Sequence, residues 1–359
     1  MTRVGLVGVG YIGKLFLDRC LDAGHDVTVF DVDSDQVAAA TEKGATAAED
    51  PASLAATTDV VVMAVPGSPE VEANMDGEAG LLAGLDEGQL LIDVTTTRPA
   101  TSVACAERCD AIGAAFLEAP ITGGAVPEGY HMMVGGPADR YEAATDGFDV
   151  LCDGHAHVGG VPDATVLKLG LQMRYAGHHA VDAEVIEFVR DNGVDPELFR
   201  DFFGFEMFDG YFSGDFSQDI EGLGGLAIWH KDIGYAREFA REQGTALPLA
   251  AVLHEAYKAT IRRAGDAEGN ASALVKYWLA LNDAEERYEE FSSVVVFRDV
   301  SSPGTLQVRP RRRRGRGRAF RAVRSGRRPG RRCPPDFRCT GWRRSGRGRR
   351  CPRRRRRTR

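Results

Sequence analysis

The segment Val4-Gly5-Leu6-Val7-Gly8-Val9-Gly10-Tyr11-Ile12-Gly13 decides the fold of this chain. Its first four residues have the pattern of a short buried strand, and the residues after Gly13 continue as an amphipathic helix through Leu15, Phe16 and Leu21. The glycines with Gly-x-Gly-x-x-Gly spacing therefore lie in a strand-to-helix turn. In such a turn the first glycine permits a tight reversal, the second lets the backbone approach a pyrophosphate, and the third lets helix and strand pack closely.

Backbone amides at the start of that helix would face the phosphates of a dinucleotide. The alternative is an ordinary strand-to-helix turn that binds nothing, which the same glycines would also allow. We expect the first interpretation, because the strand and the helix stand on the two sides that the motif requires. The residues assigned to the cofactor here are Gly8, Gly10, Tyr11, Ile12 and Gly13.

Asp31 ends the second predicted strand, eighteen residues after Gly13. A carboxylate at this position accepts hydrogen bonds from the adenosine ribose hydroxyls and repels a 2′-phosphate. No arginine stands nearby in the sequence to offset the charge, so we expect NAD, with NADP less suited. Asp31 could instead be a solvated turn residue, and Asp33 could then be the carboxylate that contacts the ribose.

Short apolar runs rich in β-branched residues alternate with helical patterns up to about residue 160, which is typical of a parallel sheet covered by helices on both faces. Beyond residue 163 long helical periodicity replaces the strands. The predicted fold class is therefore α/β: a Rossmann-type doubly wound parallel sheet followed by an all-α C-terminal domain. The predicted strands are Val4 to Val7, Val27 to Phe30, Val60 to Val65, Leu90 to Val94 and Ala115 to Glu118, and the predicted helices are Ala164 to Arg190, Pro196 to Phe203, Ile228 to Gln243, Pro248 to Ala264 and Ala271 to Asn282.

Charge is divided unevenly along the 359 residues. Residues 1–308 contain 20 Lys or Arg against 51 Asp or Glu, whereas residues 309–359 contain 25 arginines and one acid. The acidic part resembles proteins from salt-loving archaea, in which ions screen such repulsion, and an ordinary acidic protein is the alternative. We predict a dinucleotide-binding domain over residues 1–163, an all-α substrate and dimerisation domain over 164–292, and an arginine-rich tail over 293–359.

The tail has too few apolar residues to fold alone, so we expect it to be disordered. It could tether the protein to nucleic acid, because arginine clusters neutralise phosphates, or it could contact the acidic part of the chain. The abrupt change of composition favours a third interpretation, out-of-frame translation of a GC-rich coding sequence from about residue 300. A nucleic-acid partner is therefore not expected.

Other classes of protein find little support in the sequence. No apolar run reaches 18 residues, and no charged leader followed by an apolar stretch opens the chain, so we expect a cytoplasmic protein without a membrane span. The seven cysteines lack zinc-site spacing. The histidine pairs at residues 155 and 157 and at 178 and 179 have no carboxylate at ligand spacing, and we expect no metal.

Four further segments contain residues that could bind a substrate or exchange a proton with it. Consecutive glycines expose backbone amides that can bind a carboxylate, although a plain Gly-Gly turn is the alternative. A lysine among apolar neighbours is desolvated, which lowers its pKa and lets it exchange a proton with a hydroxyl, although most lone lysines are solvated surface residues. The segments are Asp93-Val94-Thr95-Thr96-Thr97-Arg98-Pro99, Ala119-Pro120-Ile121-Thr122-Gly123-Gly124, Lys168-Leu169-Gly170-Leu171-Gln172 and Lys231-Asp232.

Together with the glycine-rich turn, these segments resemble the β-hydroxyacid dehydrogenase family, which includes 3-hydroxyisobutyrate dehydrogenase and tartronate semialdehyde reductase, over roughly residues 3 to 290. The resemblance implies hydride transfer between a nicotinamide dinucleotide and a small β-hydroxy acid, with Lys168 as general acid and base, in a homodimer or homotetramer. The family's cofactor contacts fall on Val65, Pro66, Thr95, Thr96 and Lys231, its substrate contacts on Thr122, Gly123, Gly124 and Gln172, and its supporting carboxylate on Asp232.

The chain departs from the family pattern at points that leave the substrate open. Gln172 stands where the family has asparagine, and its extra methylene moves the amide by roughly an ångström. The loop from Gly124 to Met132 is shorter than usual. The Asp-Gly-Gly-Asn-Ser and Lys-x-x-His-Asn segments of 6-phosphogluconate dehydrogenases are not matched, so such an enzyme is an alternative only. A non-catalytic scaffold tethered to nucleic acid by the tail is the other alternative.

Overall fold

The computed structural model describes residues 2–125, 128–205, 207, 210–213, 225–264 and 274–282. Two compact units divide the chain at residue 297, and all described residues belong to the first. The arginine-rich tail, with every interpretation given above, lies outside the described residues. The division at residue 297 does not test the predicted domain limits at residues 163 and 292, which stay predictions.

Six parallel strands form the main sheet in the order β3-β2-β1-β4-β5-β6. The order reverses between β1 and β4, and doubly wound sheets bind ligands outside the carboxyl ends of the strands at such a switch point. The predicted fold class is confirmed, and each predicted strand exists within two residues of its predicted ends. The strands are β1 Arg3–Val7, β2 Asp26–Phe30, β3 Thr46–Ala47, β4 Val60–Met63, β5 Leu90–Asp93 and β6 Ala115–Glu118.

Three more strands extend the sheet beyond β6. The hairpin of β7 (Ile121–Ala125) and β8 (Glu128–Gly135) is antiparallel, β8 runs antiparallel to β6, and β9 (Gly154–Gly159) runs parallel to β8. These three strands and β3 were not predicted from the sequence. Their glycines and polar residues give little strand signal, and pairing between strands stabilises them instead.

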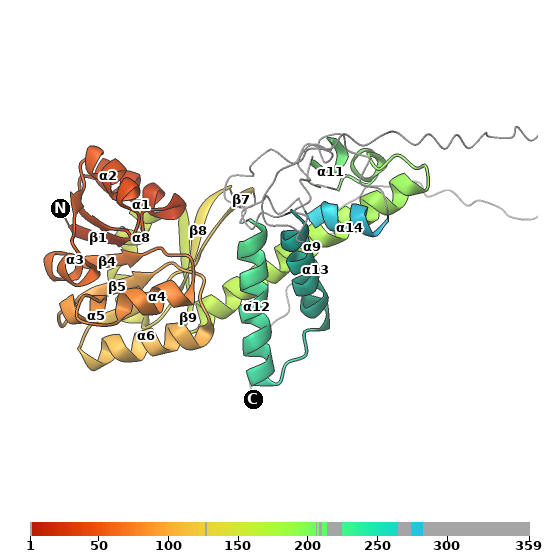
Figure 1. Ribbon diagram of the computed structural model, residues 1–359. Helices are drawn as coiled ribbons and strands as arrows, with labels where there is room; N and C mark the ends of the chain where they lie inside the picture. The colour runs from red at the N-terminus through yellow and green to blue at the C-terminus, as the bar shows by residue number, and fades with distance from the viewer. Residues whose placement is uncertain are drawn as a thin grey trace, which may run out of the picture. The chain divides into compact units, whose positions relative to one another are not determined.

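Side chains on the central strands alternate between two apolar cores, one on each face of the sheet. Val4 and Leu6 belong to one core and Val7 to the other, as expected for strands buried on both sides. Figure 1 shows helices on both faces of this sheet. The first core includes residues of α1 (Tyr11–Asp22), α2 (Ser34–Glu42), α7 (Ala138–Ala143) and α8 (Thr145–Leu151), and the second includes residues of α3 (Pro51–Thr57), α4 (Ser68–Met75), α5 (Leu81–Gly84) and α6 (Pro99–Ala111).

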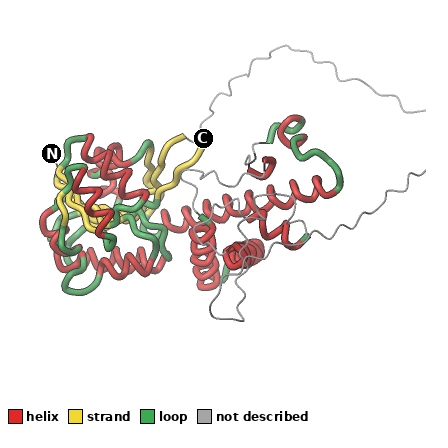
Figure 2. The backbone as a smooth tube through the Cα atoms, turned by 45° about the horizontal axis from the view of Figure 1, so that its top comes forward, coloured by secondary structure: helices red, strands yellow, loops and turns green. Residues whose placement is uncertain are grey.

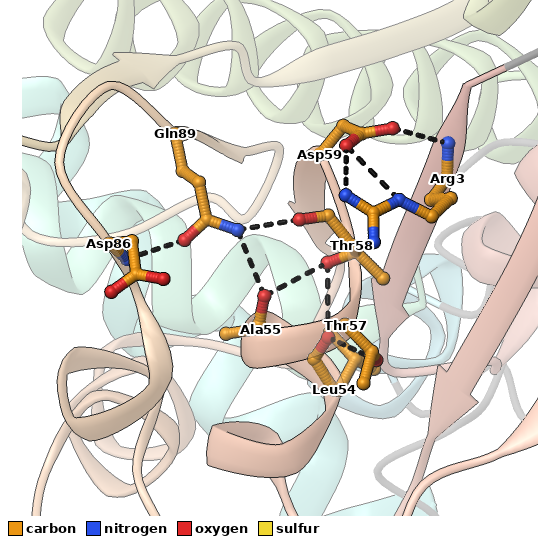
Figure 3. Close-up of polar contacts among 8 residues, drawn as sticks. All are labelled: Arg3, Leu54, Ala55, Thr57, Thr58, Asp59, Asp86 and Gln89. Carbon is orange, nitrogen blue, oxygen red and sulfur yellow. Dashed lines mark hydrogen bonds and ion pairs between the residues drawn. The ribbon is translucent and has the colours of Figure 1, made fainter.

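Polar groups at the amino ends of the strands are matched to one another (Figure 3). The Gln89 amide nitrogen donates to the carbonyl oxygens of Ala55 and Thr58. Arg3 donates to Asp59 from its backbone nitrogen at 2.9 Å and from its side-chain Nε at 3.1 Å. These contacts join the turn between α3 and β4 to its neighbours, so the polar groups drawn at this edge have partners within the protein.

In the described C-terminal part the secondary structure consists of helices, drawn red in Figure 2 and joined by loops. A core around Trp229, Ile233 and Tyr257 joins the longest of them to three others. Within the described part of the chain, no helix is long and apolar enough to cross a membrane. The helices are α9 Asp163–Asp191, α10 Leu198–Asp201, α11 Gly210–Ser213, α12 Leu226–Gln243, α13 Pro248–Ala264 and α14 Val275–Leu281, of which α10 is shorter than predicted. Residues 271–273 of the last predicted helix lie outside the described residues.

Candidate active site

The glycine-rich turn is built by close backbone contacts. Gly8 has φ +87°, and a Cβ on it would lie 2.3 Å from the carbonyl oxygen of Ala64. A Cβ on Gly13 would lie 2.0 Å from the carbonyl oxygen of Gly8. Gly10 has no atom within 4 Å of the place that a Cβ would take. The first and third glycines are thus required by packing, whereas the second leaves open space for a ligand.

Asp31 lies at the carboxyl end of β2 and faces this turn. Its Oδ2 accepts a hydrogen bond of 2.7 Å from the backbone nitrogen of Val9, and its Oδ1 accepts one of 2.9 Å from the backbone nitrogen of Asp33. Asp33 in turn caps α2 by accepting from the backbone nitrogen of Asp35 at 2.9 Å. Both carboxylates line the cleft described next, so two acidic groups stand at this end of it.

A cleft of about 1350 Å³ opens at the carboxyl ends of the strands. It extends from the glycine-rich turn to α9 and α12. Gly13 and Asp232 are buried behind its wall, and Gly124 pairs with Gly129 in the β7–β8 hairpin. The predicted site residues among its lining are Gly8, Gly10, Tyr11, Ile12, Asp31, Val65, Pro66, Thr95, Thr96, Thr122, Gly123, Lys168, Gln172 and Lys231.

Asp93 and Thr95 join the ends of β4 and β5 beneath the cleft. The backbone nitrogen of Thr95 donates to Asp93 Oδ1 at 3.0 Å, and the Thr95 hydroxyl accepts from the backbone nitrogen of Val65 at 3.2 Å. Burial raises the pKa of Asp93 to about 7, and the nearby Glu118 carboxylate raises it further while the Thr95 hydrogen bonds oppose the rise. This network holds Thr95 and the neighbouring Thr96 at the cleft wall.

Lys168 lies in the first turns of α9 and forms part of the cleft lining. Only 6% of its surface is exposed. Its amine makes no hydrogen bond or ion pair with any residue that the structure describes. Burial lowers the pKa of Lys168 to about 8, an effect that Asp232 opposes and Lys231 reinforces. An amine in this state can both accept and release a proton near neutral pH.

Asp232 connects two cleft residues from behind the wall. It is fully buried, and its Oδ2 accepts a hydrogen bond of 2.7 Å from Gln172 Nε2. Its Oδ1 lies 3.0 Å from Lys231 Nζ as an ion pair without hydrogen-bond alignment. Lys231 Nζ donates instead to the carbonyl oxygen of Thr96 at 2.9 Å. The long side chain of Lys231 thus folds back toward its neighbour in the sequence.

Glu118 fixes the start of α9, a function that the sequence did not indicate. It is buried at the end of β6 and accepts hydrogen bonds from the backbone nitrogen of Ala164 at 2.8 Å and from the Thr165 hydroxyl at 2.6 Å. Burial raises the pKa of Glu118, and these hydrogen bonds oppose the rise. A carboxylate at a helix N-terminus is favourable, so Glu118 ties the lysine-bearing helix to the sheet.

Further cleft residues were missed in the sequence. Tyr130 of β8 lies against Gly123, where a Cβ would meet its ring at 2.7 Å, and its hydroxyl is 3.0 Å from that of Tyr11. Tyr175 follows Lys168 by seven residues, a helical spacing that could have identified it. Tyr130 gave no comparable signal. Among the described residues, no group of three His, Cys, Asp or Glu side chains could hold a metal ion.

The doubly wound sheet, the glycine-rich turn after β1 and the cleft at the switch point define a dinucleotide-binding α/β protein. Residues 3–159 match the family model of the NAD binding domain of 6-phosphogluconate dehydrogenase, and residues 163–278 match that of the NAD-binding part of NADP-dependent 3-hydroxyisobutyrate dehydrogenase. The chain belongs to the β-hydroxyacid dehydrogenase family. The resemblance seen in its motifs is confirmed.

Relatives of the chain are dehydrogenases. It is 26% identical over 293 residues to 2-(hydroxymethyl)glutarate dehydrogenase of Eubacterium barkeri, covering 77% of this chain and 94% of that protein. It is 30% identical over 215 residues to the NAD⁺-dependent, decarboxylating 6-phosphogluconate dehydrogenase of Haloferax volcanii, covering 54% and 70%. The structure of Mycobacterium tuberculosis 3-hydroxyisobutyrate dehydrogenase with L-serine matches with a TM-score of 0.67 at 20% identity, covering 77% and 99%, and this likeness shows the fold.

Proposed function

We propose that the protein is an NAD-dependent dehydrogenase of a small β-hydroxy acid resembling 3-hydroxyisobutyrate, with Lys168 as the general acid and base. The observation that carries the proposal is the buried amine of Lys168, which lines the same cleft as the glycine-rich turn. Relatives that act on 2-(hydroxymethyl)glutarate and 3-hydroxyisobutyrate support the substrate class.

The residues of the cleft would have the following functions in the reaction. The Thr122 hydroxyl and the backbone of β7 hold the substrate carboxylate, while Lys168 faces the substrate hydroxyl. Bound NAD supplies the hydride acceptor. As the carbon loses hydride, the neutral amine of Lys168 takes the hydroxyl proton, and in the reverse direction its ammonium donates that proton to the oxygen. Lys231 is held in the cleft wall by the carbonyl oxygen of Thr96 and by Asp232.

The charges at the glycine-rich end of the cleft support NAD over NADP. Asp31 and Asp33 line this end, and a 2′-phosphate there would meet both carboxylates. The cations among the described lining residues, Lys168 and Lys231, come from α9 and α12. Measured affinities for NADH and NADPH test this part of the proposal. Tighter binding of NADPH would contradict it.

A 6-phosphogluconate dehydrogenase is the second candidate, favoured by the 30% identity to the Haloferax volcanii enzyme. The two are separated by a spectrophotometric screen of NADH formation in molar salt, with 3-hydroxyisobutyrate, 3-hydroxypropionate, glycerate and 6-phosphogluconate as substrates. Turnover of the small hydroxy acids supports our proposal. Turnover of 6-phosphogluconate alone, with release of carbon dioxide, would replace it with the second candidate.

Two further properties belong to the proposal. The excess of acidic residues before the tail and the Haloferax volcanii relative support a protein that is stable in high salt. The family resemblance supports a homodimer or homotetramer. Thermal unfolding in 0.1 M and 3 M KCl and sedimentation at both salt concentrations test these statements. Equal stability in both salts would contradict the first, and a monomer the second.

A further inference from the structure

We infer that Tyr235 is a positioning residue that joins the cofactor-facing segments of the sheet to the helices that carry Lys168 and Lys231, so that dinucleotide and acid each strengthen the binding of the other. This inference rests on the proposed function and deepens it, because it names the side chain through which the two ends of the cleft are coupled. Tyr235 itself does not line the cleft. It therefore acts through its neighbours and touches neither ligand.

Tyr235 lies where α12 meets both α9 and the sheet. Only 7% of its surface is exposed, and it belongs to a small apolar cluster with Ala236 of its own helix and with Leu169, which follows Lys168 on α9. Its ring centroid is 5.1 Å from the Nζ of Lys231, which stands one turn earlier on α12. The side chain thus stands at the junction of the two helices that bring a lysine to the cleft.

On the sheet side, Tyr235 meets the two segments that follow β4 and β5. Its hydroxyl oxygen accepts a hydrogen bond of 3.3 Å from the backbone nitrogen of Ser68, and the Arg98 guanidinium lies over its ring at 4.7 Å from the centroid. Ser68 Oγ also accepts from the backbone nitrogen of Arg98 at 2.8 Å, so the two segments are joined to each other. The same two segments bring Val65 and Thr96 to the cleft lining.

A glycine at position 67 lets α12 approach the sheet closely. A Cβ on Gly67 would lie 3.0 Å from the Tyr235 hydroxyl oxygen and 3.3 Å from Lys231 Cδ. Glu238, in the next turn of α12, accepts a hydrogen bond of 3.1 Å from Arg98 Nε. Lys231, Tyr235 and Glu238 are spaced so that they share one face of the helix, and all three contact the sheet segments.

Burial alone does not explain a tyrosine at this position, because an aliphatic side chain would also fill the apolar cluster. The hydroxyl of Tyr235 satisfies the backbone nitrogen of Ser68, a fully buried residue, and the ring attracts the Arg98 guanidinium. Both interactions join α12 to segments that face the dinucleotide. A dinucleotide bound to these segments would thus favour the placement of the helices that receives the acid, and linkage makes the effect reciprocal.

The test measures this coupling by NADH fluorescence. The dissociation constant of NADH is determined with and without saturating 3-hydroxyisobutyrate, a pair that cannot react because both compounds are in the reduced form. The ratio of the two constants is the coupling factor, and we expect roughly twentyfold in the wild type. Unfolded protein lowers the amplitude of the signal but leaves the ratio unchanged, so a purely structural defect does not move it.

Four variants locate the coupling. Tyr235→Leu keeps an apolar side chain but removes the ring and the hydroxyl, and it should lower the coupling factor about tenfold. Tyr235→Phe keeps the ring over Arg98 and should restore the factor to within about threefold of the wild type. Gly67→Ala disturbs the same contact from the sheet side and should also lower the factor. Tyr277→Leu, the same replacement at a partly buried tyrosine of the helical core, should leave it unchanged.

The results separate this inference from the proposed function. Wild-type turnover of a β-hydroxy acid, with a coupling factor in Tyr235→Leu within twofold of the wild type, overturns the inference and leaves the proposed function standing. An equal loss in Tyr277→Leu does the same. A wild type that oxidises none of the small hydroxy acids, and whose NADH affinity does not respond to them, overturns both. We expect a loss in Tyr235→Leu and Gly67→Ala, partial recovery in Tyr235→Phe, and no change in Tyr277→Leu.

Discussion

The two ends of the cleft are built in different ways. At the glycine-rich end, Gly8, Gly13 and Asp31 are held by backbone atoms of the segments that follow β1 and β4. At the other end, Lys168 and Gln172 depend on side chains that meet between α9 and α12. The first end is thus fixed by steric fit and the second by buried charge. Substitutions at the glycine-rich end should therefore change the affinity for the dinucleotide, whereas substitutions at the Lys168 end should change kcat.

The largest expected effect is that of Lys168→Ala. Removal of a general acid and base should lower kcat about a thousandfold, whereas the dissociation constant for NADH should stay within about twofold, because the glycine-rich end is untouched. Turnover with 3-hydroxyisobutyrate and fluorescence titration with NADH measure the two quantities. Lys258→Ala on α13, an exposed lysine, is the matched control. Normal kcat with lost NADH affinity would reverse our assignment of the two ends.

Substitutions in the glycine-rich turn should act on the other end. Gly10→Ala meets no protein atom, so stability should be nearly unchanged while NADH affinity falls roughly tenfold, because the methyl group takes the space of the ligand. Gly13→Ala meets the Gly8 carbonyl and should cost about 2 kcal/mol of stability as well. Thermal unfolding and NADH titration compare the pair. Full NADH affinity in Gly10→Ala would place the dinucleotide elsewhere.

Asp31→Asn should change the choice of cofactor. The amide oxygen can still accept from the backbone nitrogen of Val9, but the charge that repels a 2′-phosphate is gone. We expect the preference for NADH over NADPH to fall roughly tenfold by the loss of one close charge. The ratio of kcat/KM for the two cofactors measures it. An unchanged ratio would show that Asp31 does not determine the choice between NADH and NADPH.

The smallest effect is a shift of the pH profile in Asp232→Asn. With a Lys168 pKa of about 8, oxidation in the wild type should accelerate as pH rises through 8, since the neutral amine is the base. Asp232 raises this pKa, so its neutralisation should move the inflection to lower pH. The profile of kcat/KM between pH 6 and 10 measures it. A shift to higher pH would contradict the electrostatic account.

The same difference between the two ends explains what the sequence could predict. Gly8 to Gly13 and Asp31 belong to a local pattern, and the main strands alternate regularly, so their places followed from spacing. The contact of Gln172 with Asp232 joins residues 60 positions apart, and that of Glu118 with Ala164 joins residues 46 apart. Nothing local indicates such pairs. Motif resemblance identified Lys168, and its apolar neighbours predicted a lowered pKa, whereas the effects of Asp232 and Lys231 on that pKa follow only from the packed helices.

The central claim is that the Lys168 amine exchanges a proton with the substrate hydroxyl. A crystal structure of the wild type with NADH and 3-hydroxyisobutyrate tests it most directly. The account predicts that Lys168 Nζ lies within hydrogen-bond distance of the substrate hydroxyl oxygen, at about 2.6 to 3.2 Å. An amine turned into bulk solvent, or a different side chain in contact with that oxygen, would contradict it.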